Sequence, residues 1–235
     1  MMTMSLFNKV LLFFVLFSWK KVLPYKFGQF SASQLRMNIF NGFDIPSFSF
    51  NTGQDKKNKI KTFKNSIFVA TKNSLNGISM SESNRKAVEE IVNELIPQNS
   101  IKQISTDSRL NGTWDLLYTT NSGSSAGKFG PFVGGVKQIV LYDESKYYNV
   151  VSFLEGFLTA TLEASWRVID ERNWEVIFVD VKFSIGGKNI VEIPFRGTTG
   201  IWRMVYLDDN FRILYAKGGK NTIKENLYVL QRSAS

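Results

Sequence analysis

The chain has no histidine and no cysteine among its 235 residues. Without cysteine it has no disulfide, no thiolate nucleophile and no cysteine-ligated zinc. Without histidine it lacks the usual general base at neutral pH and the commonest metal ligand. These absences favour binding over catalysis, and we predict no catalytic residue and no metal ligand. The remaining enzyme hypothesis would have to rely on Asp, Glu, Tyr or Lys side chains gathered in a cavity.

Acidic residues are scarce at the N-terminus. Residues 1–66 hold ten basic side chains and two acidic ones, a net of +8 out of the +9 of the whole chain. The rest of the chain therefore carries about as many negative as positive charges. A nearly neutral surface is a poor match for a polyanion, so we predict no nucleic-acid partner for this part of the chain.

Residues 1–55 have the composition of a targeting leader. The segment 8–21 is an apolar core flanked by lysines, too short to span a bilayer comfortably and built like a signal peptide. The tract behind it is rich in Ser, Asn, Lys and Phe and poor in acids, which is typical of a transit peptide. The order resembles the two-part leader of proteins sent to algal plastids bounded by extra membranes. The alternative is a membrane-anchoring helix followed by a flexible tether.

Residues 57–98 follow as a helical lead-in. The segment 57–77 has apolar residues at helical spacing and a possible stop at Gly77. The segment 81–97 has a continuous apolar stripe, and Ser81 is its candidate N-cap. We therefore predict two helices before the main domain.

From residue 110 to residue 232 the hydrophobic period changes from that of a helix to that of a strand. Short turns and the lack of intervening helical patterns predict an antiparallel sheet. Eight strands are expected, at residues 112–120, 134–143, 147–156, 157–170, 173–185, 200–209, 211–218 and 225–232. They form either a sandwich or an up-and-down barrel, and a closed barrel of eight strands can hold one small ligand.

The first strand carries the pattern Gly112-x-Trp114, which resembles the start of lipocalin-type barrels. In that family the tryptophan plugs the closed end, and an arginine of the last strand lies over its ring. The resemblance gives these roles to Trp114 and Arg232, through a cation–π contact. The alternative for Trp114 is an ordinary core tryptophan or a side chain lining a ligand cavity.

A wider pattern closely resembles the plastid lipid-associated protein family, also called fibrillins or plastoglobulins. The matching pieces include "LNGTWDLLYTTNSGSS", "LTATLEASWRVID", "GTTGIWRMVYLDDNFRIL" and the terminal "LYVLQR", in the family's order over about residues 60–232. Near the end, "GGKNTIKEN" is longer and more basic than the family's usual turn. The resemblance implies a mainly β fold, an antiparallel eight-stranded lipocalin-like barrel after two helices. It also implies a plastid protein of plastoglobules, thylakoids or stroma, with no family-wide catalytic residue.

A non-enzymatic lipid- or isoprenoid-binding barrel is the function we expect, with a carotenoid, quinone or fatty acid as the hydrophobic ligand and no other cofactor. The plastid membrane or the plastoglobule surface is the second expected partner. The alternative is a structural protein on those surfaces, with a barrel filled by its own side chains. We assign six side chains to the ligand-binding lumen: Leu116, Tyr118, Leu162, Trp166, Trp202 and Tyr206.

Two features leave alternatives open. The Gly- and Ser-rich segment 119–135 is either a flap over the barrel mouth or an ordinary long loop. Arg203 and Arg212 lie on predicted strands with acidic neighbours. Each is either an interior arginine that recognises a carboxylate or a quinone, or one partner of an exterior salt bridge.

Overall fold

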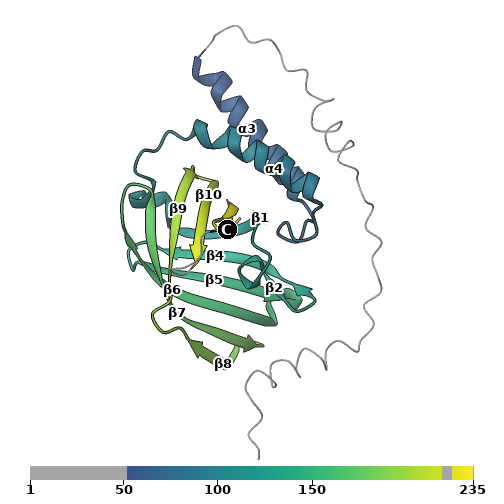
Figure 1. The fold of residues 1–235 in the computed structure, drawn as a ribbon, viewed down its shortest axis with the longest axis vertical. Coiled ribbons are helices and arrows are strands. Elements are labelled where there is room, and N and C mark those ends of the chain that lie inside the picture. Colours follow the sequence, from purple (N-terminus) through teal and green to yellow (C-terminus); the bar gives the residue numbers. More distant parts are fainter. Residues whose placement is uncertain (1–51, 219–223, 235) are drawn as a thin grey trace, which may run out of the picture.

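The computed structural model describes residues 52–218 and 224–234 (Figure 1). The signal-like core 8–21 and most of the expected leader lie outside this range. The chain first forms helices α3 (Thr52–Thr71) and α4 (Glu82–Leu95). Ser81 caps α4 as predicted, because its side chain accepts a hydrogen bond from the backbone amide of Asn84 at 3.3 Å.

Helix α3 ends at Thr71, six residues before the expected stop at Gly77. Asn73, Leu75 and Asn76 all have positive φ, a conformation that an α-helix cannot contain. These residues form a compact loop between the two helices. Neither described helix combines the length and the hydropathy needed to cross a membrane.

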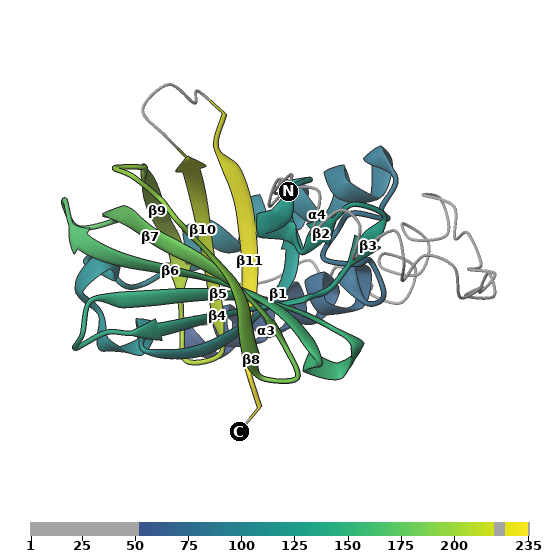
Figure 2. The ribbon, with the colours of Figure 1, turned by 90° about the horizontal axis from the view of Figure 1, so that it is seen from below.

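Eight antiparallel strands close into the predicted barrel (Figures 1 and 2). Neighbouring strands pair in the order β6-β5-β4-β1-β11-β10-β9-β7, and β7 pairs with β6 to complete the circle. The barrel strands are β1 (Gly112–Thr119), β4 (Gly135–Leu141), β5 (Lys146–Phe153), β6 (Leu158–Val168), β7 (Asn173–Ile185), β9 (Thr199–Leu207), β10 (Phe211–Gly218) and β11 (Asn226–Arg232).

Three further strands were not predicted. β2 (Lys128–Phe129) and β3 (Phe132–Val133) form a small hairpin within the Gly- and Ser-rich segment. β8 (Lys188–Pro194) pairs with the second half of β7, beyond the part of β7 that pairs with β9. The turn between β7 and β8 is Gly186-Gly187, and both residues have positive φ. A two-glycine turn of this kind is a strong hairpin signal, so β8 was recognisable in the sequence.

One end of the barrel is closed by two short 3-10 helices, Ile104–Thr106 and Ser108–Leu110, which lead into β1. Ile104 and Leu110 are fully buried among the interior side chains. Trp174 of β7 donates a hydrogen bond from its indole nitrogen to the carbonyl of Ser105 at 2.8 Å. We call this the closed end, and we call the opposite end, beside β2 and β3, the mouth.

The two helices cover part of the outer barrel surface. They lie side by side across β9, β10 and β11 (Figure 1). A second buried cluster, separate from the interior one, joins Ile67 of α3 and Val92 of α4 to Ile213 and Val229 of the barrel. The protein therefore has two cores, one inside the barrel and one between the barrel and its helices.

Candidate ligand-binding site in the barrel

Trp114 occupies the closed end in the way the resemblance implies. Its ring is fully buried, and its indole nitrogen donates a hydrogen bond to the carbonyl of Leu110 at 3.0 Å. The guanidinium carbon of Arg232 lies 4.2 Å from the ring centroid, within cation–π range. The same guanidinium donates to the carbonyls of Asp209, Asn111 and Arg109 at 2.5, 2.9 and 2.6 Å. Arg232 thus ties the first and last strands to the closing segment.

Gly112 is required by this contact. Its φ is +117°, and a Cβ added there would come within 2.6 Å of an Arg232 guanidinium nitrogen. Only glycine combines that backbone conformation with room for the arginine. The Gly-x-Trp spacing therefore has a structural reason, since the glycine admits the side chain that covers the tryptophan.

Four of the six side chains assigned to the lumen belong to the interior cluster. Leu116, Trp166 and Trp202 are buried there, and Leu162 is partly buried against it. Near the closed end, Trp166 stacks on Trp174 with ring centroids 3.8 Å apart. Trp202 meets the ring of Tyr147 edge-on, with centroids 4.5 Å apart. The interior is thus strongly aromatic.

The other two assigned side chains, Tyr118 and Tyr206, lie on the outer face beneath the helices. In each case a β-bulge explains why the tyrosine faces outward and not, as predicted, into the lumen. Between Leu116 and Tyr118 the pairing with β11 skips a residue, and a second irregularity on β9 separates Met204 from Tyr206 in the pairing with β10. One extra residue reverses the in-and-out alternation that the prediction assumed. The structure therefore removes both tyrosines from the lumen.

These two tyrosines instead anchor the helices to the barrel. Tyr118 donates its hydroxyl proton to Glu89 of α4 at 2.8 Å, and Tyr206 donates to Asp208 at 2.7 Å. Burial, followed by the adjacent carboxylate, raises the pKa of each tyrosine hydroxyl. Lys64 of α3 forms an ion pair with the same Asp208 at 2.7 Å.

The mouth is lined by phenylalanine rings. Phe129 of β2 lies edge-on to Phe153 of β5 and Phe183 of β7, with centroids 5.9 and 6.0 Å away. All three rings pack against the interior cluster, yet all three are only partly buried. The β2–β3 hairpin therefore covers the mouth through Phe129, which supports the flap interpretation over that of an ordinary loop.

The side chain of Asn76 holds this hairpin in place. It donates to the carbonyls of Ala126 and Gly134 at 3.0 and 2.9 Å, one on each side of the hairpin. Asn76 lies in the loop after α3, so the flap is tied to the helical lead-in. This link was not expected from the sequence.

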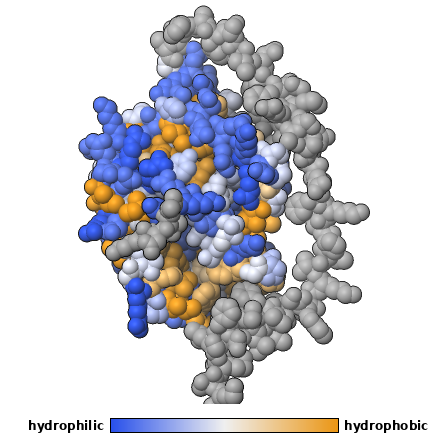
Figure 3. Space-filling model, in the orientation of Figure 1, coloured by the Kyte–Doolittle hydropathy of each residue, from blue (hydrophilic) through white to orange (hydrophobic). Residues whose placement is uncertain are grey.

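Several exposed apolar side chains lie on the strands and turns around the mouth, and others lie on α3 and in the turn between β6 and β7. Leu154 and Phe157, in the turn between β5 and β6, are 59% and 51% exposed, and Ile190 of β8 is 59% exposed. Ile193 and Phe195 near the end of β8 are also exposed. In Figure 3, hydrophobic surface gathers at the end of the molecule where Figure 1 draws β7 and β8.

Arg203 and Arg212, each predicted to be either an interior arginine or a surface ion-pair partner, lie in different places. Arg203 is on the outer surface, paired with Glu225 at 2.6 Å and lying over the ring of Tyr215. Arg212 is completely buried and projects into the barrel, where it hydrogen-bonds the side-chain oxygen of Gln138 and lies 5.1 Å from the Trp114 ring centroid. Sequence spacing alone could not separate the two cases.

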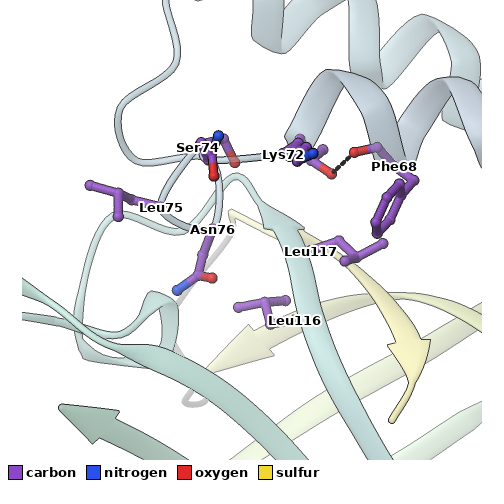
Figure 4. A pocket seen from close by; sticks show the side chains of 9 residues that line it. Phe68, Lys72, Ser74, Leu75, Asn76, Leu116 and Leu117 are labelled. Atoms are coloured by element: carbon purple, nitrogen blue, oxygen red, sulfur yellow. Dashed lines mark hydrogen bonds between the residues drawn. The ribbon is translucent and has the colours of Figure 1, made fainter. Parts of the chain in front are cut away.

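A small cleft of about 210 Å³ lies outside the barrel, between the end of α3, the loop 72–76 and β1 (Figure 4). β1 lines it at Leu116 and Leu117, and Phe68 and Leu75 flank it (Figure 4). Pockets for small organic ligands usually measure about 300–1,000 Å³. This cleft is therefore too small for an isoprenoid or acyl ligand.

The family model PAP_fibrillin matches residues 61–225, from within α3 to the segment after β10. The chain belongs to the plastid lipid-associated protein (fibrillin) family. A comparison with curated proteins finds no significant match. In this fibrillin, β11 and its Arg232 lie just beyond the matched region. The "GGKNTIKEN" segment, residues 218–226, falls mostly on residues 219–223, outside the described part of the chain.

Glu163 of β6 and Asp180 of β7 lie opposite each other, and both form ion pairs with Lys182, at 3.4 and 3.3 Å. Across residues 52–218 and 224–234, no three acidic side chains gather in a way that could hold a metal ion. The interior is lined by apolar and aromatic side chains, with the hydrogen-bonded polar side chains Arg212 and Gln138 among them.

Proposed function

We propose that this fibrillin binds one hydrophobic molecule of the carotenoid, quinone or fatty acid class inside its barrel, without catalysing a reaction. The observation that carries the proposal is the mouth. Phe129, Phe153 and Phe183 pack against the interior cluster but keep contact with solvent, and Phe129 is carried by the hairpin to which Asn76 donates two hydrogen bonds. A partly open, aromatic entrance to a closed barrel suits the entry of an apolar ligand.

We further propose that the protein works at a plastoglobule or thylakoid surface of the plastid. Exposed apolar side chains around the mouth, including Leu154, Phe157 and Ile190, support this location. Large apolar side chains in contact with water are costly, and contact with lipid removes that cost. The basic, acid-poor N-terminal leader supports import into a plastid.

A second candidate function has its own support. Trp114, Trp174 and Tyr147 are fully buried and occupy much of the closed half of the interior. A barrel filled by such side chains would act as a structural protein on the same lipid surfaces, with no ligand.

Organic extraction decides between the two functions. The full chain is isolated from its native membrane, washed and extracted, and the extract is analysed by mass spectrometry against that of an unrelated protein of the same fraction. We expect one class of hydrophobic molecule at close to one molecule per chain. An extract that contains only the bulk membrane lipids would contradict ligand binding and favour the structural function.

A further inference from the structure

Arg212 is a buried cation without an acidic partner. Its guanidinium is completely buried, and its one hydrogen bond goes to the neutral side-chain oxygen of Gln138. Two of its three nitrogens, Nε and Nη1, have no hydrogen-bond partner among the described residues. Within residues 52–218 and 224–234, no carboxylate forms an ion pair with it. Buried charges in proteins are normally paired, so this arrangement is incomplete.

The surroundings of Arg212 add to the unbalanced charge. Arg232 lies over the same indole ring from which Arg212 is 5.1 Å away, so two guanidinium groups share Trp114. Burial first, and then the neighbouring charge of Arg232, lower the pKa of Arg212 to about 10. At neutral pH the side chain is therefore still a cation, and an anion beside it would be strongly stabilised.

The interior between Arg212 and the mouth is mostly apolar. Tyr147 and Asn149 accompany Arg212 and Gln138 as polar side chains, and they hydrogen-bond each other. Further toward the mouth the wall is formed by small side chains such as Ala160 and Val151, and then by phenylalanine rings. This arrangement suits a molecule with an anionic head and a hydrocarbon tail.

We propose that Arg212 binds the carboxylate of an acyl ligand whose tail extends toward the mouth. This inference rests on the proposed function and selects the acidic member of the ligand classes named there. A neutral quinone or carotenoid would leave the charge of Arg212 unbalanced, whereas a carboxylate supplies both the charge and the acceptors that Nε and Nη1 lack.

The test compares a fatty acid with its methyl ester on the full chain. Binding of cis-parinaric acid and of methyl cis-parinarate is measured by fluorescence titration at pH 7.5. The acid should bind at least about tenfold more tightly than the ester, the effect of one charge-assisted hydrogen bond. Equal affinities would overturn the role of Arg212 and leave the proposed function standing. Failure of both probes to bind would contradict the proposed function as well.

Two variants and a competition experiment complete the test. Arg212→Gln should abolish the preference for the acid, while Arg203→Gln, on the outer surface, should leave it unchanged. If Arg212→Gln does not fold, the comparison of acid with ester on the unmodified chain still decides. Acetate and inorganic phosphate at millimolar concentration should not displace the acid. Displacement by either would show a site for small free anions and overturn the acyl-ligand proposal.

Discussion

The guanidinium of Arg232 lies 4.2 Å from the centre of the Trp114 ring and donates hydrogen bonds to three backbone carbonyls. Trp114 is fully buried, and its own indole nitrogen bonds to Leu110. This pair closes the barrel by joining its first strand to its last. Arg232 therefore contributes to the free energy of unfolding in two ways, through its contact with the Trp114 ring and through its hydrogen bonds to the carbonyls.

Substitution of Trp114 and Arg232, singly and together, tests this division. Trp114→Ala should cost roughly 3–5 kcal/mol because it leaves a cavity in the core. Arg232→Ala should cost about 2 kcal/mol, part from the ring and part from the carbonyls. Since the carbonyl bonds do not need the ring, the coupling energy should be about 1 kcal/mol, measured by urea unfolding of all four proteins. Strict additivity would show that the two side chains do not interact.

Gly112→Ala should also loosen the closed end. The added Cβ would have to displace the Arg232 guanidinium, and a φ of +117° is strained for any other residue. We expect a loss of about 2 kcal/mol in the free energy of unfolding. Gly135→Ala is the matched control, because a Cβ there meets no atom within 4 Å and its φ is not positive. An equal, small effect at both glycines would contradict the close packing of Arg232.

Asp208 connects helix α3 to the barrel, because its carboxylate accepts hydrogen bonds from Lys64 of α3 and from Tyr206 of β9. Burial opposes its charge, but the hydrogen bonds from these two side chains prevail and hold the pKa of Asp208 below its usual 3.8. A carboxyl group with a lowered pKa stabilises the folded state above its unfolded pKa, and this contribution is lost as the pH falls through the folded value.

Asp208→Asn should therefore destabilise the protein at pH 7, by about 1 kcal/mol because the site is partly exposed to solvent. The difference in unfolding free energy between this variant and the unmodified chain should begin to shrink as the pH falls below about 4, the unfolded pKa. It should vanish as the pH falls through the lower folded value, where both proteins carry a neutral group. Chemical unfolding of both proteins at several pH values measures this difference in unfolding free energy. Asp209→Asn is the control, since the Asp209 side chain is 82% exposed. A difference that stays constant from pH 7 to pH 3 would rule out a charge effect.

Much of the fold could be predicted because the alternation of apolar residues is a local property. All eight barrel strands, the two helices and the Ser81 cap follow from spacing within a few residues. Tyr118 and Tyr206 were misplaced because a single extra residue in a strand reverses every later side chain, and no short pattern marks a bulge. The β8 hairpin had a signal, Gly186-Gly187, that was overlooked.

The candidate site was harder to predict, since it depends on partners far apart in the chain. Arg203 and Arg212 are on adjacent strands, and both have acidic residues near them in sequence. Only the closed barrel shows that one reaches Glu225 on the surface and that the other reaches Gln138 in the interior. The hold of Asn76 on the flap likewise spans more than 50 residues in the chain.

The central claim is that a hydrophobic molecule binds inside the barrel. The most direct test is to fill the lumen with a larger side chain and measure ligand binding. Leu162 faces the interior on β6 and is only partly buried, while its neighbour Thr161 faces outward. A fluorescent polyene fatty acid is titrated into the full chain and into the variants Leu162→Trp and Thr161→Trp. We expect saturable binding near one molecule per chain for the unmodified protein and for Thr161→Trp, and at least about tenfold weaker binding for Leu162→Trp, because the larger ring occupies the ligand's space. Unchanged affinity in a folded Leu162→Trp variant, or no saturable binding by the unmodified chain, would contradict a ligand inside the barrel.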